Sequence, residues 1–415
     1  MSVETPTVEV GVQPPSAQDD NSIGAHVGRW WTGVKAGDVG SLPIIVGLLL
    51  ITIFFQTRNS NFITAGNFSN LIGQLAPTAT IAMGVVFVLL LGEIDLSIGY
   101  VSGIAGVFVA ELQVGGNWTP LPGWLAILCA VGATTVIGLF QGSFIAFIGV
   151  PSFVVTLAGL LAWQGVVQKM IGSTGVIVIQ NKTIFDVANY YLSHIGGWVA
   201  AGVAIALYSF SVLSGVVSRR RHRIYSDNLA LVTIRLALVI GAIVFGVWWL
   251  NTKARGFPVI GLIVIVLLIF LTWVTKRTTF GRHVYAVGGN AEAARRAGIN
   301  VRVIRWWVFG ISGAMAGMGG VMFASRLSSV DLNAGGGTIL LDAIAAAVIG
   351  GTSLFGGRGE VKSALLGALV IGSIANGLSL LNQTAATQYI VTGIILLAAV
   401  TLDTVSRRRL AASGR

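Results

Sequence analysis

The stretch KRTTFGRHVYAVGGNAEAARRAGINVRVIR, from Lys276 to Arg305, decides how the chain is arranged. It carries seven basic residues and a single acid, Glu292, and it lies between two strongly apolar runs, 258–274 and 306–324. Because positively charged loops stay on the cytoplasmic side of a membrane, two spans that flank this stretch would hold it there. We therefore predict a cytoplasmic loop over residues 275–305.

Within this loop the spacing predicts a short helix from residue 291 to residue 299. Asn290 can cap it, and Glu292 falls in the first turn, where the helix dipole favours an acid. Arg295 and Arg296 follow Glu292 at the spacing of helical ion pairs. A second stripe consists of small residues, Ala291, Ala294, Ala297 and Gly298. One charged and one small face suit docking against another protein, although an ordinary basic loop explains the periodicity equally well.

The composition indicates an integral membrane protein. The chain has 415 residues, of which 54% are hydrophobic and 10% charged, and its mean hydropathy is +0.84. A soluble domain carries about a quarter charged residues. The net charge of +11 comes from short basic loops beside apolar runs, which indicates membrane orientation rather than a nucleic-acid partner. The single cysteine, Cys129, excludes a disulfide framework, and the 55 glycines fit close contact between membrane helices.

A window of roughly twenty residues per span predicts an all-α polytopic membrane protein with about twelve transmembrane helices. They centre on residues 42–57, 75–92, 97–113, 122–147, 152–171, 196–217, 229–250, 256–274, 306–325, 338–353, 362–381 and 386–404.

The predicted organisation is a transmembrane domain, 41–405, between two cytoplasmic tails. Residues 1–40 are expected to be disordered and interfacial, with Trp30 and Trp31 leading into the first span. Residues 406–415 form the second tail. With both termini inside, the cytoplasmic connections hold most of the basic residues, including RRRHR at 219–223. The largest outer connection, 172–195, is expected to be an interfacial helix, a docking surface or an ordinary loop.

The motif GEIDLSIG, residues 92–99, places Glu93 and Asp95 between two spans. Asp95 or Ser97 can cap the entering helix, which is the commoner use of such residues. The alternative is a gate or a partner contact, because ionisable groups at membrane depth are costly and usually functional.

The motif VPSFVVTLAGLLAWQGVV, residues 150–167, begins a span at Pro151, where no amide donor is missed. We interpret Trp163, Gln164 and Gln168 as one polar–aromatic stripe, which would stack on a sugar ring and hydrogen-bond its hydroxyls. Asn376, in the span 362–381, is a further candidate for this sugar path. For any single one of these residues, hydrogen bonding between helices is the commoner alternative.

The motif AIAAAVIGGTSLFGGRGEVKSALLGALVIG, residues 343–372, is a glycine-punctuated hinge between two spans. Its candidate hinge residues are Gly350, Gly351, Gly356 and Gly357. Lys362 follows glycines as in a phosphate-binding loop, but that loop requires a glycine directly before the lysine and Val361 stands there. Without a catalytic triad or a carboxylate pair in the sequence, we predict neither catalysis nor a cofactor site for this chain.

Four motifs in this order closely resemble the permease subunit of bacterial ABC importers for ribose, xylose and related monosaccharides. They are GEIDLSIG, VPSFVVTLAGLLA, TTFGRHVYAVGGNAEAARRAGI and AIAAAVIGGTSLFGGRGEVKSALLGALV, and the resemblance covers residues 42–405. It implies a core of about ten spans of roughly twenty residues each. Between the 172–195 connection and Thr279, three apolar runs stand where ribose-type members have one. This extra helix pair resembles the xylose-type permease.

The resemblance also implies partners and a bacterial cytoplasmic membrane. The implied partners are an ABC ATPase subunit that binds ATP and Mg, an extracytoplasmic sugar-binding protein, a second permease copy and membrane lipid. Glu292-Ala293-Ala294 followed by Gly298 matches the start of the loop that such permeases insert into the ATPase, whereas its downstream Ile-x-Leu-Pro portion is missing after Ile299. The residues expected to couple to the ATPase are Asn290, Glu292, Ala293, Ala294, Arg295, Arg296 and Gly298.

Two other functions are weighed against a monosaccharide ABC permease. A branched-chain amino-acid-type ABC permease would share the fold, but an anionic cargo group requires cationic or helix N-terminal partners at the midplane, and only Arg235 lies well inside a span. An ion-coupled secondary transporter would show acids in mid-membrane, and its two candidates, Glu111 and Asp342, lie near predicted span ends. A membrane enzyme is supported least.

Overall fold

The computed structural model describes residues 42–114, 119–221 and 228–412. The predicted tail 1–40 with Trp30 and Trp31, the last two residues of RRRHR and residues 413–415 lie outside the described residues. The described residues divide into two compact units, 201–221 with 228–244, and 42–114 with 119–200 and 245–412. We call the second the core unit.

Twelve apolar helices in the described ranges correspond one to one to the predicted spans. Eight are long enough to cross a membrane: α3 (Ala65–Leu90), α5 (Gly123–Ser143, continued by a π-helix to Ile148), α6 (Ser152–Ile171), α8 (His194–Arg221), α9 (Leu229–Lys253), α10 (Val259–Arg277), α13 (Val301–Leu327) and α15 (Val361–Leu380). Three are shorter, α2 (Leu42–Arg58), α4 (Ile98–Val114) and α14 (Ile339–Ile349), and in a fourth, α16 (Ala385–Ala412), the apolar part covers only Ala385–Ala398. The all-α prediction is confirmed.

Helix boundaries differ from the predictions where polar residues flank an apolar run. α3 begins at Ala65 instead of near residue 75, because the Thr64 side chain caps it by accepting a hydrogen bond from Asn67 N at 3.3 Å. At the other end of the chain, α16 continues to Ala412. The segment from residue 406 to 412, predicted as a separate tail, is therefore a continuation of the last helix.

Two helices form the centre of the core unit. In both α3 and α13, 78% of the residues in the most apolar 18-residue stretch of the helix are buried. α13 packs against α3, α4 and α5, and α3 also packs against α15. Small residues permit these approaches, since a Cβ on Gly84 would lie 3.2 Å from the Ser312 backbone and one on Gly320 would overlap the Ser102 carbonyl.

The extra helix pair predicted between residues 196 and 250 corresponds to α8 and α9. Residues 201–244 of this pair belong to the smaller unit. Within it, Arg235, the basic residue predicted inside a span, donates a hydrogen bond from Nε to the Tyr208 hydroxyl at 3.0 Å. The Tyr208 hydroxyl thus accepts a hydrogen bond from the Arg235 guanidinium within the same unit.

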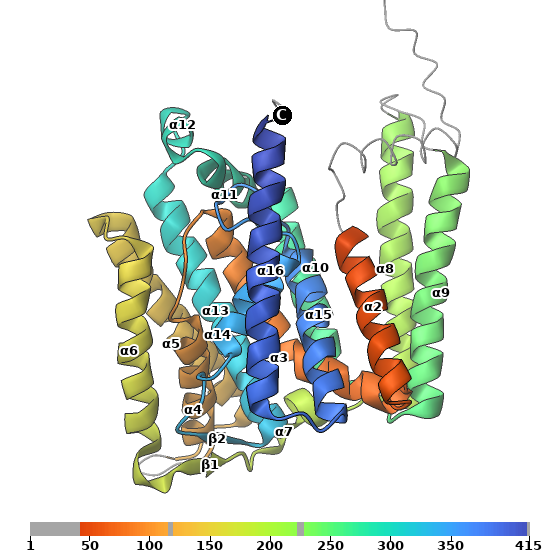
Figure 1. The fold of residues 1–415 in the computed structure, drawn as a ribbon, viewed down its shortest axis with the longest axis horizontal. Helices are drawn as coiled ribbons and strands as arrows, with labels where there is room; N and C mark the ends of the chain where they lie inside the picture. Colours follow the sequence, from red (N-terminus) through yellow and green to blue (C-terminus); the bar gives the residue numbers. More distant parts are fainter. Residues whose placement is uncertain (1–41, 115–118, 222–227, 413–415) are drawn as a thin grey trace, which may run out of the picture. The chain divides into compact units, whose positions relative to one another are not determined.

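The connections of the core unit gather at two opposite ends (Figure 1). One end, which we call the α12 end, carries α11 (Thr279–Gly289) and α12 (Ala291–Arg296). The other, the ribbon end, carries α7 (Lys182–Asn189) and two short strands, β1 (Val176–Val178) and β2 (Ser329–Asp331), which pair antiparallel with Val176 opposite Asp331. α7 confirms a helix within 172–195. Ala188 N donates to Ser325 Oγ at 2.9 Å, which fixes α7 to the end of α13.

Candidate functional site

The predicted cap and ion pairs of α12 are confirmed. The Asn290 side chain accepts a hydrogen bond from Ala293 N at 2.9 Å. Glu292 lies 2.8 Å from the Arg295 guanidinium and 3.2 Å from Arg296 Nε. Hydrogen bonds from Arg295 and then Arg296 lower the pKa of Glu292, so that the carboxylate stays ionised. α12 therefore presents a charged, internally paired surface.

The small-residue stripe on this helix needs a correction. Ala294 is only 5% exposed and packs into the chain's own core, so it is not part of an open docking face. The helix also ends at Arg296, before the predicted residue 299, since Gly298 adopts a φ of +85°, the left-handed conformation that terminates helices. Among the predicted coupling residues, all but Ala294 are exposed: Asn290, Glu292, Ala293, Arg295, Arg296 and Gly298.

A contact between three chain segments connects α12 to the rest of the α12 end. A Cβ on Gly288, near the end of α11, would overlap the Leu90 carbonyl at the end of α3. Gly357 N donates a hydrogen bond to that same carbonyl at 2.9 Å. We call this contact of residues 90–92, 288–289 and 356–357 the glycine junction. It packs backbone directly on backbone, which the absence of side chains at Gly288, Gly356 and Gly357 permits.

The predicted hinge glycines lie at or beside the glycine junction. Gly351, Gly356 and Gly357 have φ values of +103°, +87° and +72°, and a Cβ on Gly350 would overlap the backbone of Ser363 at the start of α15. The structure therefore brings the predicted hinge into contact with α11. Sequence reasoning missed this junction, because neither the separate helix α11 nor the proximity of Leu90 leaves a local signal.

The acids of GEIDLSIG tie the loop after α3 to α13. Asp95 is buried, and its Oδ1 accepts hydrogen bonds from Ser97 N at 3.0 Å and Ser97 Oγ at 2.7 Å. Its Oδ2 accepts one from Ser312 Oγ of α13 at 3.1 Å. Glu93 Oε1 lies 3.2 Å from Arg305 Nε at the start of α13. The hydrogen bonds between Asp95 and Ser97 match the capping interpretation. The contacts of Asp95 and Glu93 with α13 are additional to capping.

The predicted sugar-path stripe is not a single surface. Trp163 is partly buried beside a cavity of about 370 Å³, and its Nε1 has no hydrogen-bond partner in the described chain. Gln164 is partly buried, whereas Gln168 is exposed. Five residues of α-helix rotate by about 140°, so Trp163 and Gln168 face different directions.

Asn376, on α15, forms hydrogen bonds between helices, which is the commoner alternative to a role in the sugar path. It is 2% exposed, donates to Asn67 Oδ1 at 3.0 Å and accepts from Asn67 Nδ2 at 2.8 Å. Its amide therefore joins α3 to α15 rather than lying free for a sugar. This corrects its assignment to the sugar path.

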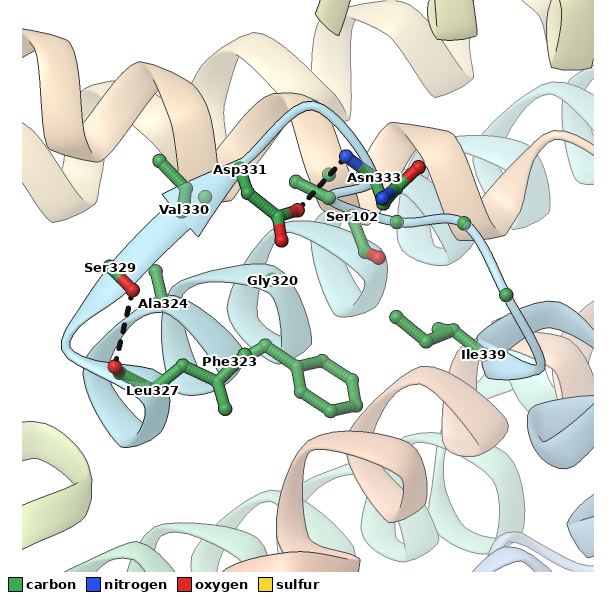
Figure 2. A pocket seen from close by; sticks show the side chains of 16 residues that line it. Ser102, Gly320, Phe323, Ala324, Leu327, Ser329, Val330, Asp331, Asn333 and Ile339 are labelled. Carbon is green, nitrogen blue, oxygen red and sulfur yellow. Dashed lines mark hydrogen bonds between the residues drawn. The ribbon is translucent and has the colours of Figure 1, made fainter. Parts of the chain in front are cut away.

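Two adjoining cavities open at the ribbon end. The first, about 280 Å³, lies between α4, α13 and the loop that follows β2 (Figure 2). In it Asn333 N donates to Asp331 Oδ1 at 2.9 Å, while the side chains of Phe323 and Ile339 line the side away from β2. Both of these residues also line the second cavity, about 290 Å³. One apolar pair thus borders both spaces.

The second cavity is polar and lies among α3, α13, α14, α15 and α16. Arg326, Asp342 and Gln74 line it. Asp342 Oδ2 accepts a hydrogen bond from Thr338 Oγ1 at 2.7 Å, whereas its buried Oδ1 has no partner in the described part of the chain. Sequence reasoning missed this cavity because five helices supply its residues. The signal available in the sequence was that Arg326 and Asp342 lie on either side of the connection between two neighbouring predicted spans, 306–325 and 338–353.

Comparison with known proteins gives the family. A family model described as the permease component of branched-chain amino acid transport systems matches residues 67–400. The xylose transport system permease protein of Escherichia coli (strain K12) is 37% identical over 387 residues, covering 91% of this chain and 95% of the relative. The corresponding protein of Haemophilus influenzae is 37% identical, with 88% and 96% covered.

A ribose import permease protein of Escherichia coli (strain K12) is 30% identical over 359 residues, covering 86% of this chain and 92% of the relative. No solved structure matches the chain significantly. The chain is thus an integral membrane protein that belongs to the family described as the permease component of branched-chain amino acid transport systems.

Proposed function

We propose that the protein is the permease subunit of an ABC importer that carries D-xylose or a similar monosaccharide across the bacterial cytoplasmic membrane. The observation that carries this proposal is 37% identity over 91% of the chain to a permease named for xylose. Identity to a ribose permease is lower, at 30%, which favours the xylose type. In this proposal both termini lie in the cytoplasm, and ATP and Mg bind to a partner ATPase.

The contacts at the α12 end support a mechanism of coupling. The exposed charged surface of α12 would contact the ATPase, and α11 would carry the displacement to the glycine junction. There Gly288 touches the end of α3 while Gly357 belongs to the loop between α14 and α15. A single displacement of α11 would therefore act both on the GEIDLSIG segment that follows α3 and on the predicted glycine hinge. ATP would shift the population of outward and inward conformations, because the ATPase binds the two unequally.

The ribbon end would receive the cargo from an extracytoplasmic sugar-binding protein. The polar cavity there offers both donors and acceptors, and each of the two ribbon-end cavities, at about 280 and 290 Å³, lies near the lower limit of small-molecule sites, roughly 300 Å³. A second permease copy would complete the transporter. Hydroxyl-rich, uncharged cargo suits the amide and hydroxyl groups around Arg326 and Asp342.

A branched-chain amino acid is the second candidate cargo. The family description favours it, and so does the presence of one basic and one acidic residue, Arg326 and Asp342, on the same cavity. A zwitterion would pair its carboxylate with the first and its ammonium with the second.

The test is transport by the complete importer in vesicles. Permease, ATPase and sugar-binding protein are reconstituted together, and uptake of labelled D-xylose, D-ribose and leucine is followed with and without ATP. We expect ATP-dependent uptake of D-xylose above that of ribose and none of leucine. Uptake of leucine alone would assign the second candidate. Concentration of sugar by the permease without the ATPase would overturn the ABC mechanism.

A further inference from the structure

A fourth cavity, of about 830 Å³, lies at the α12 end, and the proposed transport cycle gives it no role. It is formed by the end of α10, by α11 and by the loop that precedes α15. Four basic residues line it, together with a single acid, Glu360: Lys276, Arg282, Arg358 and Lys362. We call it the basic cavity. Its lining carries an excess of three positive charges.

The two lysines of the basic cavity are partly neutralised, but the two arginines are not. Glu360 Oε1 lies 2.8 Å from Lys276 Nζ, and its Oε2 lies 2.6 Å from Lys362 Nζ. Burial alone would raise the pKa of Glu360, but hydrogen bonds from the two lysines outweigh it and lower the pKa, so the acid stays ionised. Among the described residues, neither the Arg282 nor the Arg358 guanidinium has a hydrogen bond or an ion pair, although the backbone of each residue is hydrogen-bonded.

Uncharged donors complete the lining. Ser363 is only 5% exposed, lines the cavity, and its hydroxyl has no hydrogen-bond partner within the described ranges. It belongs to the first turn of α15, a helix of 20 residues that begins without a side-chain cap. Amides at such a helix start favour an anion. Tyr285 also lines the cavity but is already engaged, since its hydroxyl donates to Gly359 O at 2.8 Å.

The position of the cavity along α10 places it at the level of lipid headgroups. Trp273, one turn before Lys276, is 55% exposed, and the apolar residues Val266, Ile269 and Phe270 are exposed on the same helix. Exposed tryptophan at the end of an apolar span marks the membrane–water interface. An ATPase docked on α12 would approach from the water, whereas a ligand at this depth comes from the bilayer.

We propose that the basic cavity binds the phosphate of an anionic phospholipid headgroup, with Arg282 and Arg358 as its main ligands. Two guanidinium groups without other partners suit the planar, multidentate recognition of phosphate. Basic clusters at the cytoplasmic surface attract anionic lipids in the same way. Because Gly350, Gly351 and Gly357 line the cavity together with Arg282 of α11, a bound headgroup would join the predicted hinge to the coupling segment.

The experiment measures lipid retention by the purified full-length permease with no ATPase present. The protein in neutral detergent is exposed to equal amounts of phosphatidylglycerol and phosphatidylcholine, and the lipids that stay bound are counted by native mass spectrometry. We expect preferential retention of phosphatidylglycerol. Arg282→Gln combined with Arg358→Gln should lower this preference by about tenfold. Arg277→Gln, which removes an exposed charge next to Lys276 but outside the cavity, should leave it unchanged.

Further variants and a competitor make each outcome decisive. Arg282→Lys with Arg358→Lys should restore part of the preference, and unchanged thermal melting would show that the glutamine variants fold. Equal retention by the double glutamine variant and the wild type would overturn the proposal, and so would an equal loss in Arg277→Gln. Displacement of the lipid by inorganic phosphate would assign a free-phosphate site instead. In a separate pull-down with the ATPase, loss of capture by the double glutamine variant together with unchanged lipid retention would overturn the proposal and assign a protein contact.

Discussion

The two ends of the core unit differ in how their carboxylates are satisfied. At the α12 end Glu93, Asp95, Glu292 and Glu360 all have partners, and the backbone segments of the glycine junction touch directly. At the ribbon end Asp342 keeps a buried oxygen without a partner in the described chain, and two cavities adjoin.

This difference matches the demands that the proposed function makes on each end. A segment that transmits displacement must be stiff, and close backbone packing with hydrogen-bonded carboxylates gives stiffness. A region that receives cargo must keep polar groups free, at a cost in stability. Variants at matched positions can therefore test whether the two ends really play different parts.

The largest effect is expected at the glycine junction. Gly288→Val would drive a side chain into the Leu90 carbonyl and should lower the free energy of unfolding by about 3 kcal/mol. Gly289→Ala is the matched control, since nothing lies within 4 Å of a Cβ there. Thermal or denaturant unfolding in detergent measures both. Equal stability of the two variants would show that the junction is not tightly packed.

A matched pair of carboxylates gives the next largest effect. Asp95→Asn replaces an oxygen that accepts hydrogen bonds by a donor and should cost about 2 kcal/mol of stability. Asp342→Asn removes a charge whose Oδ1 has no partner in the described residues and should leave stability unchanged or raise it. The same unfolding experiment compares them. If Asp342→Asn were the more harmful change, the contrast between the two ends would be wrong.

A smaller effect is expected for the amide pair at the ribbon end. A double-mutant cycle of Asn67→Ala and Asn376→Ala should give a coupling energy of about 0.6–1.7 kcal/mol, as for other hydrogen bonds between membrane helices. Its readout is unfolding rather than transport. A loss of sugar uptake from Asn376→Ala without any loss of stability would return this residue to the sugar path.

The smallest effect on stability, but a large one on transport, is expected at α12. Glu292→Ala with Arg296→Ala removes exposed charges, so the melting temperature should stay unchanged while ATP-driven uptake falls by about tenfold or more. Arg302→Ala, an exposed charge of the next helix, is the control. Normal uptake by the double variant would contradict the coupling role of α12.

Substitution of Gly298 would be a poor test of this docking face, since any side chain there strains a backbone with φ of +85°. Ala297→Trp adds bulk on the same exposed turn without that strain, because Ala297 has φ of −80°. It should weaken capture of the ATPase while leaving the melting temperature unchanged. Undiminished capture would argue that this turn is not the contact.

Local chemistry was predictable from the sequence, whereas contacts between distant segments were not. Hydropathy placed all twelve apolar helices, and Asn290 with Glu292 and its arginines gave α12 correctly. The inward position of Ala294 and the Asn67–Asn376 pair depend on which helices are neighbours. The same holds for Asp95, whose partner Ser312 is 217 positions away. A single sequence carries no signal for such pairings.

The pairing of β1 with β2 has a consequence for biosynthesis. Val176 leaves the ribosome 155 positions before its partner Asp331, which at 5–20 residues per second amounts to roughly 8–30 s. Through that interval the strand and the adjoining helix α7 have been synthesised, yet their anchor on α13 has not been made. The ribbon end therefore closes late in translation, and a ribosome that stalls before residue 331 would leave β1 and α7 open to proteases.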